Sequence, residues 1–189
     1  MAKRYLRGDQ VYLRALEPED LDFIYDVENH PDHWAMTDFT VPYSRFSIRQ
    51  YLRDNRNDLF ADKQLRLVIA LKGENTPIGI ADLFNYQPLH AHAEVGILVR
   101  QKYRGRGYAG EALGLLCDYA FGFLALHQLV AYVVADNHDS RELFCDNEFV
   151  SRGTLREWWR LDGEFKDVIV YQRLGSWDKE KGQSHPLWM

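Results

Sequence analysis

The segment from Arg100 to Gly110 constrains the fold most, because it joins a strand-like run to a strongly patterned helix through a glycine-rich turn. After the turn, apolar residues recur at the spacing of a single helix face. This stripe consists of Leu113, Leu116, Cys117, Ala120 and Leu124. We therefore predict a strand over Ala93–Arg100, a helix from Gly107 to about Gly122, and an exposed turn between them.

The turn also has a distinctive charge. It carries Arg100, Lys102, Arg104 and Arg106 without any acidic residue. The first amides of a helix have no partner within the helix, and the helix dipole favours an anion beside them. Glycine lets the backbone approach a ligand closely, because no Cβ stands in the way. These features predict a pyrophosphate-binding turn; the alternative is a glycine turn with a solvated basic face.

Two other phosphate-binding motifs must be weighed at this turn. Gly105, Gly107 and Gly110 spell G-x-G-x-x-G, and Asp136 ends the next strand, as in the dinucleotide-binding fingerprint. In that fingerprint the first glycine follows the strand almost at once, whereas residues 101–104 intervene here. A P-loop requires Gly-Lys-Ser/Thr, which this turn lacks. Both motifs therefore fit less well than a separate kind of pyrophosphate turn.

The remaining pattern predicts one domain over residues 1–174, followed by a polar tail over 175–189. Alternating or apolar runs favour further strands, and the Asp162-Gly163 pair is typical of a hairpin turn. The resulting order of elements is a mixed α/β (α+β) arrangement around one sheet. The predicted strands are 11–16, 65–71, 77–84, 128–134, 150–160 and 164–173; the predicted helices are 17–30, 47–56 and 139–146.

Composition limits the possible functions. The net charge of −5 argues against general duplex binding, so no nucleic-acid partner is expected. No run is long and apolar enough to suggest a membrane span or a signal peptide, which favours a cytoplasmic location. The two cysteines, Cys117 and Cys145, suit neither a disulfide framework nor a structural zinc site. We expect both to be buried small residues and expect no metal.

The turn and its surroundings resemble the GNAT superfamily of acetyl-CoA-dependent N-acetyltransferases. Arg104-Gly-Arg-Gly-Tyr-Ala109 fits the family's pyrophosphate pattern, Gln/Arg-x-x-Gly-x-Gly/Ala, at every specified position. The strand Glu94–Val99 before it and the run Asn137–Ser140 after it also match, so the resemblance extends from about Tyr12 to Leu174. It implies one bent sheet of about seven strands flanked by about four helices, with the fourth and fifth strands splayed apart.

The resemblance also implies where acetyl-CoA, the cosubstrate, binds. Backbone groups of Ile97, Leu98 and Val99 would hold the pantetheine and the acetyl carbonyl, and Asn137 would bond the pantetheine chain. The pyrophosphate would lie on the amides of the turn, namely Arg104, Gly105, Arg106, Gly107, Tyr108 and Ala109. Phe144 stands where many family members have a tyrosine that protonates the leaving thiolate, so the sequence departs from the family at that position.

Glu94 is the candidate general base, because it lies on the strand that would face the acetyl group. Strand alternation places Glu94, Gly96 and Leu98 on one face, and the sequence leaves open which face lines the site. Glu94 could instead pair with a neighbouring cation on the sheet. His90 and His92 lie near it and titrate in the useful range, but we expect them to be surface or loop residues.

The acceptor is expected to be a cation. Residues 15–32 contain seven carboxylates and no Lys or Arg, and by the resemblance this region forms one wall of the acceptor site. For most of these carboxylates a solvated helix face is the better interpretation. We expect Asp32 and Asp38 to contact the substrate, and Trp34 and Tyr43 to cover a cation with an aromatic face.

Within the superfamily, the motifs Leu13–Asp20 and Arg160–Asp167 are similar to bacterial spermidine/diamine and ribosomal-protein N-terminal acetyltransferases. Thr40-Val41 stands where the polyamine enzymes tend to carry acids. The expected acceptor is a diamine or polyamine such as spermidine. The alternatives are the basic N-terminus of a ribosomal protein, or acyl-CoA binding without catalysis. We also expect a homodimer or a larger homo-oligomer.

Overall fold

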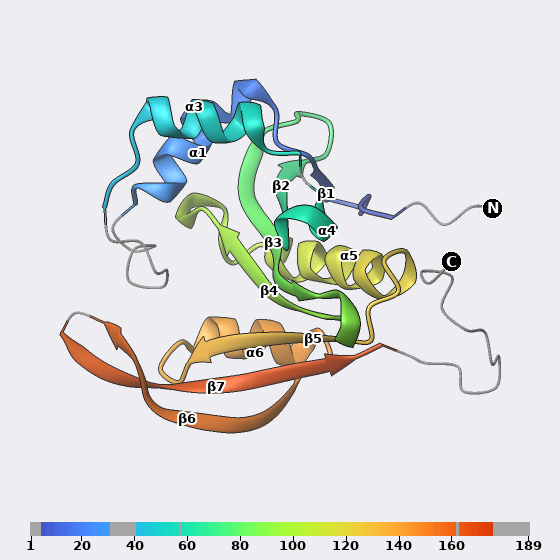
Figure 1. Ribbon diagram of the computed structural model, residues 1–189, viewed down its shortest axis with the longest axis vertical. Helices are drawn as coiled ribbons and strands as arrows, with labels where there is room; N and C mark the ends of the chain where they lie inside the picture. Colours follow the sequence, from blue (N-terminus) through green and yellow to red (C-terminus); the bar gives the residue numbers. More distant parts are fainter. Residues whose placement is uncertain (1–4, 31–40, 57, 162, 176–189) are drawn as a thin grey trace.

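The computed structural model describes residues 5–30, 41–56, 58–161 and 163–175. These residues form a seven-stranded sheet in the order β1-β2-β3-β4-β5-β7-β6, in which only β4 and β5 run parallel (Figure 1). The expected mixed sheet is therefore confirmed. Its strands are β1 (Val11–Arg14), β2 (Leu65–Leu71), β3 (Pro77–Gln87), β4 (His92–Val99), β5 (Gln128–Val134), β6 (Val150–Leu161) and β7 (Glu164–Leu174).

Five α-helices are described, and α5 corresponds closely to the stripe in the sequence. The short α4 was not predicted; it begins at Asp58, whose side chain accepts hydrogen bonds from the amides of Phe60 and Ala61. Three 3₁₀ turns accompany the helices: η1 (Pro18–Asp20), η2 (Pro88–His90) and η3 (Gln101–Tyr103). The helices are α1 (Leu21–Glu28), α3 (Arg45–Asp54), α4 (Leu59–Asp62), α5 (Tyr108–Gly122) and α6 (His138–Asp146).

The predicted splaying of the two central strands is confirmed. β4 and β5 pair only over residues 92–94 and 128–130, and the last pair joins Glu94 to Val130. Beyond that pair the two strands diverge (Figure 1). β4 continues to Val99 along β3, while β5 continues to Val134 along β7. Each strand therefore has one unpaired side at this opening, which we call the β4/β5 fork.

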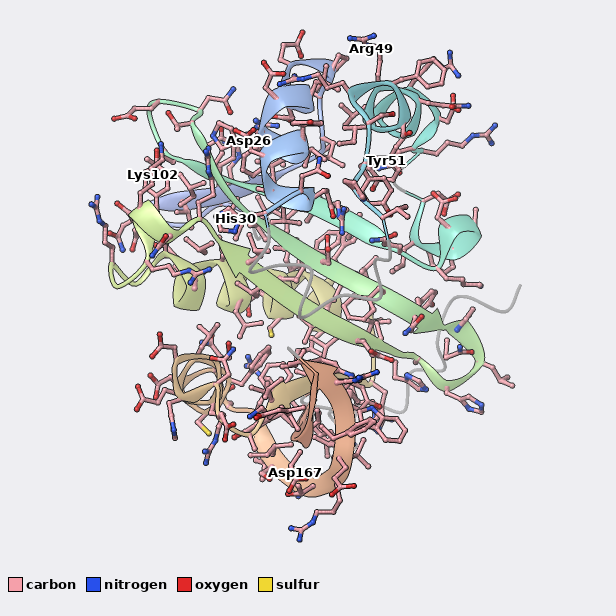
Figure 2. The ribbon with its side chains drawn as sticks, turned by 90° about the vertical axis from the view of Figure 1, so that its left-hand side faces the viewer. Asp26, His30, Arg49, Tyr51, Lys102 and Asp167 are labelled. Atoms are coloured by element: carbon pink, nitrogen blue, oxygen red, sulfur yellow. The ribbon has the colours of Figure 1, made fainter. Side chains whose placement is uncertain are left out.

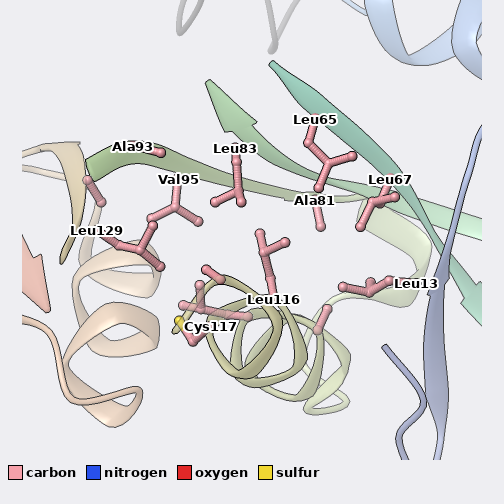
Figure 3. Close-up of a cluster of buried hydrophobic side chains, with 14 of the residues drawn as sticks. Leu13, Leu65, Leu67, Ala81, Leu83, Ala93, Val95, Leu116, Cys117 and Leu129 are labelled. Carbon is pink, nitrogen blue, oxygen red and sulfur yellow. The ribbon is translucent and has the colours of Figure 1, made fainter. Parts of the chain in front are cut away.

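The main hydrophobic core lies between the sheet and α5 (Figure 3). Leu113, Leu116 and Cys117 of the predicted stripe are almost completely buried there. They meet the alternate residues of the strands that point to the same side, such as Leu83, Val95 and Leu129. Full burial of each large apolar side chain contributes about 1.5–3 kcal/mol. This core therefore fixes the position of α5 beneath the fork.

A smaller core covers part of the opposite face of the sheet. It joins Phe23, Ile24 and Val27 of α1 and Ile48 of α3 to apolar residues of the strands. The α1–α3 pair therefore covers this face near β2 and β3, above the strands in Figure 1.

Two further predictions can be compared with the described residues. Cys117 is buried as expected, but Cys145 is exposed on α6, so its predicted burial is wrong. No helix within the described ranges is long and apolar enough to cross a membrane. Apart from Gly175, the predicted tail over 175–189 lies outside the described residues.

Candidate functional site

The glycine-rich turn between η3 and α5 has the conformation that anion binding requires. Gly105 and Gly107 have φ values of +72° and +80°, in the left-handed region that favours glycine. A Cβ added at either position would meet no other atom within 4 Å. The turn is therefore open on its outer side, where a ligand would approach.

The amides of this turn are available to a ligand. The first backbone hydrogen bond of α5 runs from the Glu111 amide to the Gly107 carbonyl. Within the described residues, the amides from Gly105 to Gly110 have no protein acceptor. The Arg104 guanidinium is tied back, because its Nε donates to the Val99 carbonyl at 2.9 Å. The residues predicted to hold a pyrophosphate, 104–109, are thus brought together; the Arg104 amide donates to the Gln101 carbonyl at 3.1 Å, and the N–H groups of 105–109 are unpaired.

Glu111 connects this helix start to the first strand. Its Oε1 accepts from the Gln10 amide at 2.9 Å, and a Cβ on Gly8 would lie 2.0 Å from that oxygen. Gly8 therefore allows the chain before β1 to pass beside the first turn of α5. The contact holds the N-terminus of α5 in place.

The start of α6 lies at the end of β5, on the other side of the fork. The Asn137 side chain caps α6 by accepting from the Ser140 amide at 3.0 Å, so its Oδ1 is engaged while its amide group can still donate. Arg141 donates from Nη1 to the Ala135 carbonyl, but its buried Nε has no partner in the described structure. These donors suit a ligand with amide carbonyls, such as a pantetheine chain.

Phe144 of α6 lies in the main core. It is 6% exposed and makes an edge contact with Phe149, with ring centroids 5.1 Å apart, and it stacks near Tyr171. It has no proton to give. Its predicted contact with the cosubstrate stays a prediction.

The structure resolves which face Glu94 occupies. Ala93, Val95 and Val99 point into the core beside α5, so Glu94, Gly96 and Leu98 lie on the face covered by α1 and α3. Glu94 accepts a hydrogen bond from the Asn85 side-chain amide at 3.0 Å, rather than pairing with a cation on the sheet. It is therefore a half-buried carboxylate at the last residue pair before the fork opens.

The three β4 residues expected to contact the cosubstrate follow Glu94. Ile97 and Val99 pack toward the core, whereas Leu98 packs toward α1 and α3. Backbone N–H and C=O groups that point away from β3 have no neighbouring strand here, since the pairing with β5 has ended. Apart from the Val99 carbonyl, which accepts from Arg104 Nε, these groups are open to a ligand in the fork.

On the face of the sheet that α1 and α3 cover lies an ion network that the sequence did not predict. Arg66 of β2 donates through Nη2 to Asp82 of β3 at 2.9 Å and through Nη1 to Glu28 of α1. Burial alone would lower the pKa of Arg66, but the two carboxylates outweigh it and raise the pKa above its ordinary value. Burial raises the pKa of Asp82 although Arg66 acts in the opposite direction, and β-pairing places Asp82 directly opposite Gly96.

A cavity of about 290 Å³ opens on the outer side of this network. Tyr51 of α3 lines it together with Arg66, and burial raises the pKa of Tyr51. The other lining residues are Asp54, Asn55, Asp62 and Gln64.

Four of the seven carboxylates in residues 15–32 lie in ion pairs, so this region is less acidic than its sequence alone indicates, and its role as a wall of the acceptor site stays a prediction. Asp20 is buried in a two-bond ion pair with Arg14 and also accepts from the Glu17 amide. Arg14 lies directly before this run in the sequence, and the partners of the other paired carboxylates come from separate elements. The further pairs are Asp22 with Arg45, Asp26 with Arg100, and Glu28 with Arg66.

The predicted acceptor residues are only partly described, since Asp32, Trp34 and Asp38 lie outside the described residues. Tyr43 is described and half-buried, and burial together with Glu28 raises its pKa. Asn29 holds the backbone of Tyr43 through two hydrogen bonds, of 2.8 and 3.0 Å. In Figure 2, His30 and Tyr51 lie on the same side of the sheet, opposite α5.

The two histidines near Glu94 behave as expected for surface residues. His90 lies exposed in η2, and its ring stacks on that of His92 at a centroid distance of 6.1 Å. Neither makes a described hydrogen bond to Glu94.

Comparison with known proteins now identifies the family. The model of the acetyltransferase (GNAT) domain matches residues 10–150. The chain belongs to the GNAT acetyltransferase family. It is a GNAT-family N-acetyltransferase, and the resemblance seen in its turn is confirmed.

Similar GNAT proteins include the spermidine N(1)-acetyltransferase of Vibrio cholerae. It is 29% identical over 164 residues, which cover 85% of this chain and 91% of that protein. The ribosomal-protein-serine acetyltransferase of Escherichia coli is 27% identical over 101 residues, covering 53% and 56% of the two chains. A solved structure of the Vibrio cholerae spermidine N-acetyltransferase, in complex with CoA and spermine, has a TM-score of 0.77, with 28% identity, 88% coverage of this chain and 96% of that one.

Proposed function

We propose that this GNAT protein transfers the acetyl group of acetyl-CoA to a primary amine of a diamine or polyamine such as spermidine. The observation that carries the proposal is the β4/β5 fork, which places unpaired strand edges beside a helix start whose amides are free. Glu94 lies at the base of that fork, on the face opposite α5. The similarity to spermidine acetyltransferases supports the acceptor class.

The donor would be held along the fork. The amides at 105–110 would receive its pyrophosphate, as the helix dipole and the open glycines favour. The Asn137 amide group and the Arg141 Nε would bond the pantetheine chain. Backbone groups of residues 97–99 would hold the acetyl carbonyl, so that its oxygen meets an N–H donor as negative charge develops.

The acceptor must lose a proton before it can react. An alkyl amine has a pKa near 10, so roughly one molecule in a thousand is neutral at pH 7. Glu94 would take this proton, directly or through a water molecule. The Asn85 side chain orients the carboxylate by bonding one oxygen, which leaves the other for the amine.

The surface beside Glu94 suits an alkyl cation. Gly96 has no side chain, and a Cβ there would lie 3.3 Å from Cε1 of Phe84, so the Phe84 ring covers that position. An aromatic face attracts an ammonium group. Asp82 and Glu28, which both bond Arg66, would face a second amino group with carboxylate oxygens. Tyr43, Asp32, Trp34 and Asp38 complete the proposed acceptor contacts.

Calorimetric titration with acetyl-CoA and with NADH tests the donor. We expect micromolar binding of acetyl-CoA and none of NADH, and Arg106→Glu should weaken acetyl-CoA binding by adding a negative charge beside the pyrophosphate. NADH binding without acetyl-CoA binding would contradict the proposal. Thiol release measured with spermidine, a diamine and a basic peptide then tests the acceptor; release with none of them would overturn acetyl transfer to amines.

Replacing Glu94 by Gln tests the base. We expect kcat to fall on the order of 100-fold, with acetyl-CoA affinity within about twofold of wild type. The fall should be largest at low pH, where fewer acceptor amines are already neutral. The matched control is Glu74→Gln, which alters an exposed carboxylate in the β2–β3 turn. Unchanged kinetics for Glu94→Gln would remove Glu94 as the base.

A second acceptor is favoured by the similarity to the ribosomal-protein-serine acetyltransferase. A basic peptide N-terminus would bring the same reacting amine to Glu94 but no second alkyl ammonium. Comparing kcat/KM for spermidine and for such peptides decides between the two acceptors.

A further inference from the structure

Tyr132 of β5 lies across the fork from the proposed base. The buried residues Leu129, Ala131 and Val133 point into the main core, so Tyr132 points to the other face, where Glu94 lies. Tyr132 follows Val130, the partner of Glu94, by two residues. The two side chains interact across the fork, because the charge of Glu94 contributes to raising the pKa of Tyr132.

The position opposite Tyr132 on β4 carries no side chain. Continuing the register from the Glu94–Val130 pair places Gly96 level with Tyr132, on the arm that has separated from β5. The Phe84 ring borders this position, and Gly96 itself places no side chain between Tyr132 and the open edge of β4. A group held on the backbone of β4 would therefore face the Tyr132 hydroxyl.

The surroundings keep this hydroxyl protonated. Partial burial raises the pKa of Tyr132, and the negative charge of Glu94 raises it further. A phenol that keeps its proton acts as a hydrogen-bond donor and as an acid. At the other side of β5, Phe144 has no hydroxyl and is buried among aromatic rings. Within the described part of the fork, the Tyr132 hydroxyl is thus placed to donate a proton to a group on which negative charge develops.

We propose that Tyr132 is the catalytic acid that protonates the departing thiolate of CoA. This inference rests on the proposed acetyl transfer. The amine nitrogen forms a bond to the acetyl carbon, the carbon–sulfur bond breaks, and its electron pair goes to sulfur, which takes the Tyr132 proton. Glu94, after passing the proton of the acceptor ammonium to solvent, takes the second proton, which the nitrogen releases as the amide forms. That proton then returns from Glu94 to the phenolate, so both side chains are restored and the products are the amide and CoA thiol.

Tyr132→Phe tests this role while keeping the aromatic ring. We expect kcat with spermidine to fall on the order of 100-fold, while acetyl-CoA binding stays within about twofold of wild type. The matched control is Tyr119→Phe, because Tyr119 is also half-buried with a pKa raised by burial, but lies on α5 among Tyr5 and Phe123. An unchanged kcat in Tyr132→Phe would overturn the proposal.

A second measurement separates this inference from the proposed function. The thiol of bound CoA can be titrated through the ultraviolet absorbance of its thiolate, without any amine present. If Tyr132 donates to sulfur, the thiol of bound CoA should ionise at lower pH in the wild type than in Tyr132→Phe. Equal thiol pKa values in the two proteins would overturn the role of Tyr132, even if acetyl transfer is established. A difference in these values would support it, even if no amine tested is acetylated.

Discussion

The two faces of the sheet differ in a way that separates support from chemistry. The face beside α5 is covered by a continuous apolar core (Figure 3). The opposite face has a smaller apolar core near α1 and α3, and beside it lie the Arg66 network, Glu94 and Tyr132. Apolar burial on one side can hold the fork in a fixed shape, because it requires no polar partners. Under the proposed function, polar groups on the other side bind the amine and react with it.

The contrast between the two faces can be tested by substitutions on each, and the largest expected change in stability is on the polar face. Arg66→Met leaves Glu28 and Asp82 without their shared cation, so we expect a loss of about 3–5 kcal/mol in the free energy of unfolding. Urea unfolding measures it. Arg53→Met, which removes an exposed pair with Asp54, is the control and should leave the unfolding free energy nearly unchanged. Equal losses in the two variants would show that the network is not a buried one.

A somewhat smaller effect is expected on the apolar face. Leu116→Ala removes a fully buried side chain from α5, and we expect a loss of about 3 kcal/mol in unfolding free energy. Leu89→Ala, at a position 76% exposed, should cost less than about 0.5 kcal/mol. If this face acts only as support, Leu116→Ala should leave the KM for amines unchanged below its unfolding transition. A raised KM would mean that the two faces are coupled.

The smallest expected effect concerns how well the core beside α5 excludes a reagent from its buried thiol. Burial raises the pKa of Cys117 to about 11, because it disfavours the thiolate, while Cys145 is exposed. In mildly alkaline buffer a disulfide reagent should therefore modify one thiol per native chain rapidly and the second only after denaturation. Cys145→Ser should remove the fast reaction. Equal rates for both thiols would show that the core beside α5 opens readily.

Local patterns predicted much of the fold. The apolar stripe gave α5, and the hairpin signal at Asp162-Gly163 gave the β6–β7 pair, because both signals come from residues close in sequence. The glycine-rich turn was predicted for the same reason. The exposure of Cys145 and the helix at Leu59–Asp62 were not predicted. Neither a four-residue helix nor a single exposed position gives a periodic signal in the sequence.

The site depends on contacts that sequence spacing does not reveal. The alternation of residues on β4 predicted that Glu94, Gly96 and Leu98 share one face of the sheet. Only the position of α5 determines which of the two faces this is. The partners of Asp20 and Glu28 come from β1 and β2, so an acidic run in the sequence became a set of ion pairs. The role proposed for Tyr132 depends on the separation of β5 from β4. A pattern of alternating residues carries no sign of that separation.

Asn29 has a consequence for how acceptor preference can change. Its side chain bonds the carbonyl of Tyr25 on one side and both backbone groups of Tyr43 on the other, so it clasps the two ends of the intervening stretch. Under the proposed function, an exchange of residues 31–40 for those of a relative would test whether acceptor preference can change while Tyr25, Asn29 and Tyr43 stay as they are.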